Sequence, residues 1–177
     1  MIALAVMVFA GLRFITPGYG MFYTPKWGPS LGNRLGWILM EAPVFVCMAI
    51  LWACSDRRGE TALIAMASLF MLHYFQRSFI FPLLIKGESR MPLSIILMGC
   101  VFNVVNAYLI GGWLFYVSPV GVYPVTWLLT PKFIIGTMIF FTGMGINLHS
   151  DQIIRHLRQR GDRRHYIPKG GMFRYVT

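Results

Sequence analysis

Five long apolar stretches constrain the fold of this chain more than any other feature. They cover residues 1–15, 35–54, 61–85, 92–117 and 132–149. A helix needs about 20 mostly apolar residues to cross a bilayer. Only 12% of the residues are charged, about half the usual 25% of soluble proteins. The sequence therefore predicts an all-α fold, a polytopic transmembrane helix bundle of about five spans, with residues 1–177 forming one domain. Stretch 1–15 is short, but it lacks the basic start of a cleaved signal peptide, which favours a retained span.

The charge distribution predicts how the bundle lies in the membrane. The chain has 16 Lys and Arg against 6 Asp and Glu, and its 14 Phe, 8 Tyr and 5 Trp argue against a nucleic-acid-binding chain. With an outside N-terminus and a cytosolic C-terminal side, twelve basic residues are cytosolic and three lie opposite, as the positive-inside rule requires. We therefore expect a multi-pass integral membrane protein, of the endoplasmic reticulum or of a bacterial inner membrane. Its three Cys show no metal or redox spacing.

Polar side chains inside the predicted spans are candidate functional groups, because charge at membrane depth is costly. Glu41 is the only acid within a span, and Trp37 lies one turn before it. In the third span, Tyr74 and Arg77 are three residues apart, so their side chains are expected to converge and to provide a partner for Glu41. The alternative is that Glu41 pairs with an arginine only to hold helices together.

Further polar residues lie in the fourth and fifth spans. Asn103 and Asn106 share a helical face and could bind a ligand or merely join two helices. A polar stripe at helical spacing suits a ligand with amide, hydroxyl and phosphate groups; it consists of Asn147, Asp151, Arg155 and Arg158. The alternative is a juxtamembrane helix whose arginines meet anionic lipid. A turn at Gly170 and Gly171 follows, able to bring backbone N–H groups close to a ligand.

With these motifs assembled, the chain resembles the steroid 5α-reductase family, the 3-oxo-5α-steroid 4-dehydrogenases. The resemblance covers nearly the whole chain, and residues 143–151 (GMGINLHSD) are its most specific part. The other matching segments are Gly18-Tyr19-Gly20, residues 37–43, residues 73–77 (HYFQR), Met91-Pro92, Asn106, the rest of 143–158, and residues 167–177.

The resemblance implies an NADPH-dependent reductase that saturates the Δ4 double bond of a 3-oxosteroid by hydride transfer to C5. It implies that Glu41 and Tyr74 hold the 3-carbonyl, where Tyr74 and a protonated Glu41 could donate hydrogen bonds to the developing enolate. Trp37 and Asn106 are expected to contact the steroid. The cofactor contacts that it implies are Tyr19, Arg77, Asn147, Asp151 and Arg158, with Gly170 and Gly171 nearby; the stripe adds Arg155.

Three alternatives and one departure accompany this interpretation. The fold could instead serve a reductase of another enone, an enoyl thioester or a polyprenol; an S-adenosylmethionine-dependent methyltransferase; or a non-catalytic lipid-binding bundle. The family has seven spans and continues beyond the segment that corresponds to residues 167–177. We therefore expect this chain to lack the C-terminal spans of the family.

Its partners are expected to be steroid and membrane lipid, and the protein is expected to be a monomer.

Overall fold

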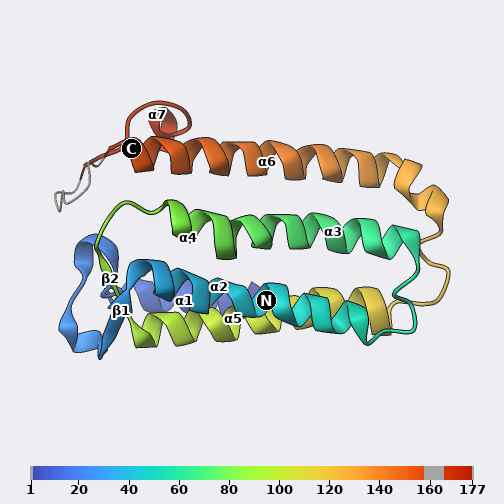
Figure 1. The fold of residues 1–177 in the computed structure, drawn as a ribbon, viewed down its shortest axis with the longest axis horizontal. Helices are drawn as coiled ribbons and strands as arrows, with labels where there is room; N and C mark the ends of the chain where they lie inside the picture. Colours follow the sequence, from blue (N-terminus) through green and yellow to red (C-terminus); the bar gives the residue numbers. More distant parts are fainter. Residues whose placement is uncertain (1, 158–165, 177) are drawn as a thin grey trace.

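The computed structural model describes residues 2–157 and 166–176, and these are mostly helical. Four long helical segments run antiparallel along the molecule (Figure 1). They are α2 (Asn33–Ala53); α3 (Thr61–Phe75), continued by the π-helix η3 (Gln76–Ile80) and by α4 (Phe81–Leu84); α5 (Leu93–Gly112), continued by the π-helix η4 (Trp113–Val117); and α6 (Pro131–His156). The shorter elements are α1 (Ile2–Leu12), the 3₁₀ turns η1 (Gly20–Phe22), η2 (Pro25–Trp27) and η5 (Val125–Leu129), the strands β1 (Ser30–Gly32) and β2 (Arg90–Pro92), and α7 (Phe173–Val176).

Four of the five expected spans correspond to helices that are long and apolar enough to cross a membrane among the described residues. The longest, α6, has 26 residues, or about 39 Å at 1.5 Å per residue. Helix α1 has 11 residues, or about 16 Å, against a hydrocarbon core of about 30 Å. The all-α membrane bundle is thus confirmed at the level of four helices. The count of five spans and the orientation remain predictions.

The helices form layers, with α3 and α4 between the α2–α5 pair and α6 (Figure 1). Helix α2 makes its most extensive packing with α5. The buried core lies towards the end opposite the strands and consists of Met48, Leu63, Ala67, Leu114 and Phe115. By contrast, α6 has no buried residue. The polar groups of α2 are therefore positioned mainly by α5, and α6 faces the rest of the bundle only along one side.

A short antiparallel ladder closes one end of the bundle. Strands β1 and β2 pair with Leu31 opposite Met91, and the Arg90 guanidinium donates to the backbone and hydroxyl oxygens of Ser30. The Arg34 guanidinium donates to the Ile85 carbonyl at 2.7 Å. This ladder ties the start of α2 to the start of α5, and the described C-terminal tail lies at the same end (Figure 1).

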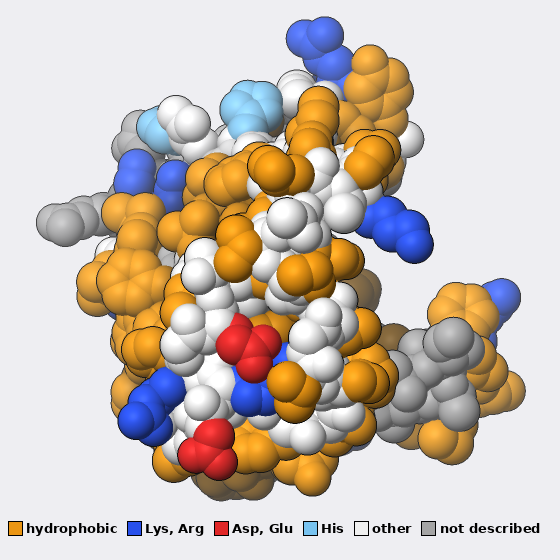
Figure 2. Space-filling model, turned by 90° about the vertical axis from the view of Figure 1, so that its right-hand side faces the viewer, with side chains coloured by type: hydrophobic (Ala, Val, Ile, Leu, Met, Phe, Trp, Pro, Cys, Tyr) orange, Lys and Arg blue, Asp and Glu red, His pale blue; other side chains and the backbone are white. Residues whose placement is uncertain are grey.

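An arginine organises the opposite end. Arg57 pairs with Glu60 at 2.7 Å and donates to the Ser118 carbonyl at 2.8 Å. The Glu60 hydrogen bond raises the pKa of Arg57, and the Arg57 hydrogen bond lowers the pKa of Glu60. Figure 2 looks onto this end, where acidic and basic side chains lie together within a largely apolar surface. The contacts fasten the α2–α3 loop to the last turn of η4.

Candidate functional site

Glu41 is buried on α2, with 9% of its surface exposed. Its hydrogen-bonding partner is Asn103 of α5, whose Nδ2 lies 3.1 Å from Glu41 Oε2 and 2.8 Å from the carbonyl oxygen of Met40. The sequence reasoning placed the partner of Glu41 on the third span, which is wrong for the hydrogen bond, because α2 packs chiefly against α5. Arg77 of the third span acts on Glu41 only electrostatically.

Tyr74 lies near this pair. Its hydroxyl accepts a hydrogen bond from Asn106 Nδ2 at 3.0 Å, and the Glu41 charge acts on it electrostatically. The Phe70 ring, one turn earlier on α3, packs against the Tyr74 ring with a centroid separation of 4.6 Å. The structure therefore brings buried Glu41 and partly buried Tyr74 and Asn106 into one region, as the sequence predicts for Glu41 and Tyr74.

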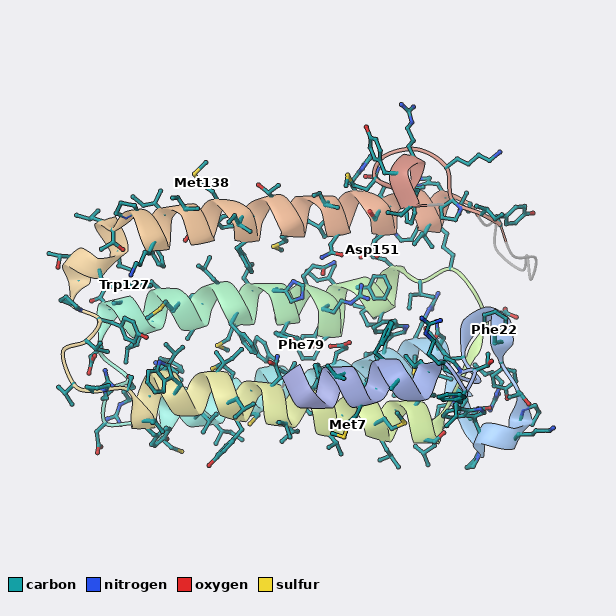
Figure 3. The ribbon with its side chains drawn as sticks, turned by 180° about the vertical axis from the view of Figure 1, so that it is seen from behind. Met7, Phe22, Phe79, Trp127, Met138 and Asp151 are labelled. Atoms are coloured by element: carbon teal, nitrogen blue, oxygen red, sulfur yellow. The ribbon has the colours of Figure 1, made fainter. Side chains whose placement is uncertain are left out.

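The Arg77 side chain contacts residues of three helical segments, α2, α4 and α6. Its guanidinium stacks over the Trp37 ring at 4.5 Å and over the Phe81 ring at 4.2 Å. Its Nη1 lies 3.4 Å from Asp151 Oδ2, and Asp151 points from α6 towards the α3–α4 layer (Figure 3). Tyr74 turns to α5, whereas Arg77 turns to α6. The two side chains therefore have different direct partners, although each interacts electrostatically with Glu41.

A cleft of about 340 Å³ opens at the end that carries the strands. Residues of five regions line it: residues 19–20, the start of α2, the start of α4, the 85–89 loop, and α6 with the following tail. The expected site residues among them are Tyr19, Trp37, Asp151 and Arg155; the others include Asn33, Phe81, Lys86 and Tyr166. A volume in the range of about 300–1,000 Å³ is typical of small-molecule sites.

The polar groups of the cleft have an incomplete set of partners. Asn33 Oδ1 is buried and has no hydrogen-bond partner among the described residues. Burial raises the pKa of Tyr19, while hydrogen bonds with Trp37 and Asn33 and the charge of Arg77 act in the opposite direction. A buried acceptor without a partner is costly unless a ligand or water satisfies it. The cleft therefore offers an acceptor, a phenol, a carboxylate and cations to a polar ligand.

Four expected cofactor residues of the described part of the chain do not line this cleft: Arg77, Asn147, Gly170 and Gly171. Asn147 is exposed on α6, one turn before Asp151. Gly170 and Gly171 have φ values of 97° and 50°, and a Cβ on Gly171 would lie 2.8 Å from the His149 ring. The tail thus folds back on α6, and only glycine permits that approach. Arg158 lies outside the described residues.

The sequence reasoning did not identify Asn33, Lys86 or Tyr166 as site residues. A single amide, a loop lysine and a tail tyrosine carry no distinctive spacing. Tyr166 comes to the cleft because the tail returns along α6, and Lys86 because the 85–89 loop follows α4. Only the fold brings these segments together.

The described part of the chain also forms an open apolar groove of about 540 Å³. Three helical segments line it, α3, α5 with η4, and α6. Its lining residues are Met66, Leu69, Phe70, Leu109, Ile110, Trp113, Leu114 and Phe140. Phe70 contacts Tyr74, and Ile110 lies one turn beyond Asn106 on α5. The groove therefore lies about one helical turn from Tyr74 on α3 and from Asn106 on α5, and its lining is almost wholly apolar.

Comparisons of the sequence with known proteins show the family of the chain. A family model described as 3-oxo-5-alpha-steroid 4-dehydrogenase matches residues 89–177. The chain is 33% identical to 3-oxo-5-alpha-steroid 4-dehydrogenase 1 of Bos taurus, over 99% of this chain and 68% of that protein. It is 38% identical to 3-oxo-5-alpha-steroid 4-dehydrogenase 2 of Sus scrofa, over 98% and 68%. It is also 29% identical to steroid 5-alpha-reductase DET2 of Gossypium hirsutum, over 98% and 68%. The chain belongs to the 3-oxo-5-alpha-steroid 4-dehydrogenase family of oxidoreductases.

Proposed function

We propose that this protein uses NADPH to reduce the Δ4 double bond of a 3-oxosteroid, giving the 5α-3-oxosteroid. The observation that carries the proposal is the group of buried Glu41 and partly buried Tyr74, each hydrogen-bonded to an amide of α5. An open apolar groove, lined by the Phe70 ring that contacts Tyr74, lies nearby, and a polar cleft lies towards the strand end. A lipophilic body with one carbonyl oxygen suits the first, and a charged cofactor suits the second.

The chemistry of the cleft fits NADPH. Arg155 and Lys86 supply positive charge for phosphate groups, and Arg can hold phosphate with two hydrogen bonds. Tyr19, Asp151 and the unpartnered Asn33 Oδ1 supply groups for ribose hydroxyls or for the carboxamide. Arg77 lies over the ring of Trp37, which lines the cleft, and acts electrostatically on Glu41. When bound, NADPH supplies the hydride that adds to C5 of the enone.

Glu41 and Tyr74 would act on the oxygen at the far end of the conjugated system. When a hydride adds to C5, the π electrons move through C4 and the electron density reaches the 3-oxygen. The Tyr74 hydroxyl and a protonated Glu41 each donate a hydrogen bond to that oxygen and so stabilise the enolate. A proton from solvent then adds to C4, the carbonyl re-forms, and the substrate has gained one hydride and one proton. Donors aimed at a developing oxyanion each contribute about 10²–10³-fold to the rate.

Substitution of the two donors tests this proposal. We expect Glu41→Gln and Tyr74→Phe each to lower enone reduction in membranes by about 10²-fold or more, measured as loss of the ultraviolet absorbance of the enone. Tyr108→Phe is the matched control, because Tyr108 is 63% exposed on α5. Full activity in the Glu41→Gln, Tyr74→Phe double variant would contradict the assignment of the carbonyl site. NADPH-independent turnover would contradict the assignment of the cofactor.

A further inference from the structure

We propose that Asn103 is a positioning residue that directs the O–H donor of Glu41 towards the steroid 3-oxygen, and that Asn106 does the same for Tyr74. The inference rests on the proposed function, because it concerns the same carbonyl site. Both amides are on α5, three residues apart and therefore on the same face of the helix. Each one contacts one of the two groups assigned to the carbonyl oxygen.

Burial and two hydrogen bonds fix the orientation of the Asn103 side chain. Its side chain is 5% exposed. An amide nitrogen carries two hydrogens, and Asn103 Nδ2 has two acceptors, the Met40 carbonyl oxygen at 2.8 Å and Glu41 Oε2 at 3.1 Å. The first acceptor belongs to the backbone immediately before Glu41. The carboxyl group is therefore held relative to its own helix, and not only relative to α5.

The direction of these hydrogen bonds determines which atoms of Glu41 remain for a ligand. Because Oε2 accepts from Asn103, a proton on the carboxyl group is left for Oε1. A protonated Glu41 thus has one donor, at the oxygen that Asn103 does not occupy. Without Asn103, the carboxyl group could rotate about its last side-chain bond and present either oxygen, protonated or bare.

The hydrogen bond from Asn106 likewise determines which group of Tyr74 remains for a ligand. Its hydroxyl has one hydrogen and can both donate and accept. Asn106 Nδ2 donates to it at 3.0 Å, which occupies an acceptor site and leaves the hydrogen free for another oxygen. The Phe70 ring at 4.6 Å restricts the tilt of the phenol. The amides of Asn103 and Asn106 therefore leave the O–H groups of Glu41 and Tyr74 free to donate to one acceptor, the steroid carbonyl oxygen.

A purely structural role predicts something different. Buried amides often join helices, and losing such a bond weakens the packing for every ligand alike. A positioning role instead affects only ligands that carry the 3-oxygen. The two roles are therefore separated by comparing a 3-oxo-Δ4-steroid with its counterpart that lacks the 3-oxygen.

The test measures equilibrium binding of both steroids to the full chain reconstituted in lipid nanodiscs. We expect the wild type to prefer the 3-oxosteroid and Asn103→Leu to reduce that preference by about tenfold, since one hydrogen bond is worth roughly that factor. Ser94→Ala is the matched control: it removes another α5 hydrogen bond, from Ser94 Oγ to the Trp27 carbonyl at 2.7 Å. It should leave the preference unchanged. If Asn103→Leu does not fold, Asn103→Asp keeps the size and replaces the donor nitrogen by oxygen.

The outcomes separate this inference from the proposed function. Equal weakening of both steroids by Asn103→Leu, or an unchanged preference, would overturn the positioning role while leaving the carbonyl site intact. A wild type without any preference for the 3-oxosteroid would contradict the carbonyl site, and the positioning role with it. A further readout is additivity. If Asn103 acts through Glu41, then Asn103→Leu should cause little additional loss of preference in a Glu41→Gln background.

Discussion

A guanidinium that lies over two aromatic rings connects the two halves of the candidate site. Arg77 lies over Trp37 and Phe81, forms an ion pair with Asp151, and acts electrostatically on Glu41 and Tyr19. A planar guanidinium can stack and pair at the same time, whereas an ammonium group is a point charge. At the scale of single residues, Arg77 therefore links the proposed cofactor cleft to the proposed carbonyl site.

Arg77→Lys is expected to weaken NADPH binding by about tenfold or more. Lysine keeps the charge, but it lacks the planar guanidinium that packs on the aromatic rings and donates paired hydrogen bonds. The measurement is titration of membranes or nanodiscs with NADPH, followed by its fluorescence. Arg58→Lys, at the other end of the molecule, is the control. An unchanged affinity in Arg77→Lys would show that the guanidinium has no part in the cofactor site.

Asp151→Asn tests the α6 side of the same ion pair. Removing the carboxylate charge loosens Arg77 and removes an acceptor from the cleft, so we expect NADPH affinity to fall by about tenfold, the effect of losing one charge-assisted hydrogen bond. Gln152→Ala changes the next residue, whose side chain is exposed on α6, and should bind NADPH as the wild type does. If the two variants bound NADPH equally well, Asp151 would not belong to the cofactor site.

At this scale, the position of Glu41 and Tyr74 within apolar stretches predicts them as site residues, because ionisable and polar groups are costly there. Asp151 is predicted instead from the polar stripe at helical spacing. Neither feature identifies the partners of these residues. Asn103 could have bonded any neighbouring helix, and only the packing of α2 on α5 pairs it with Glu41. Asn33 and Tyr166 entered the cleft through loops whose paths have no sequence signature.

At the scale of elements, the two π-helical segments shape the bundle. Segment η3 carries Arg77, and segment η4 ends at Val117; the amide of the following Ser118 donates to the Trp113 carbonyl at 2.8 Å. Arg57 then donates to the Leu114 carbonyl at 3.2 Å and to Ser118 Oγ at 2.8 Å. A guanidinium thus satisfies carbonyl groups that the helix end would leave without partners. The sequence predicts the helices but not these segments, because a shift from i→i+4 to i→i+5 bonding changes no hydrophobic period.

Loss of this arginine should destabilise the end of the bundle. We expect Arg57→Ala to lower the stability of the fold by on the order of 1–3 kcal/mol, because several carbonyl and hydroxyl acceptors lose a charged donor. Thermal unfolding in detergent measures the effect, with the neighbouring Arg58→Ala as control. Equal melting temperatures for the two variants would contradict the role of Arg57.

The pH dependence of this ion pair has a definite sign. The Arg57 hydrogen bond lowers the pKa of Glu60 in the folded protein. Its contribution to stability is therefore present above the unfolded pKa of Glu60 and is lost as the pH falls through the folded pKa. We expect the melting temperature of the wild type to exceed that of Glu60→Gln near neutral pH, and the difference to disappear on acidification. The effect is small, because the Glu60 side chain is 33% exposed. A difference that grew on acidification would contradict this assignment.

At the scale of the whole molecule, the loops divide between two ends. The strands, the 85–89 loop and the tail lie at one end, and the 54–60 and 118–130 loops lie at the other (Figure 1). The apolar stretches predicted the four long helices well, because a bilayer requires length and apolarity and little else. They did not predict that α6 would bury none of its residues. Apolarity alone does not tell a lipid-facing side chain from a packed one.

The orientation of these ends is testable with cysteine labelling. Cys54 is exposed at the end of α2, and Lys86 is exposed in the 85–89 loop. In a Cys47→Ser, Cys100→Ser background, we expect a membrane-impermeant maleimide to label Cys54 from outside intact cells or sealed vesicles of known orientation. With Cys54 also replaced by Ser, Lys86→Cys should react only after permeabilisation. The reverse pattern would place the proposed cofactor cleft on the wrong side of the membrane.

The central claim is that hydride from NADPH reaches C5 of a 3-oxo-Δ4-steroid whose 3-oxygen is held by Glu41 and Tyr74. Its most direct test is incubation of membranes containing the wild type with that steroid and NADPH that carries deuterium at the transferable position. The account predicts a saturated 3-oxosteroid with deuterium at C5, determined by NMR, and almost none of this product from the Glu41→Gln, Tyr74→Phe double variant. Deuterium at any other carbon, no deuterated product from the wild type, or wild-type yield from the double variant would contradict it.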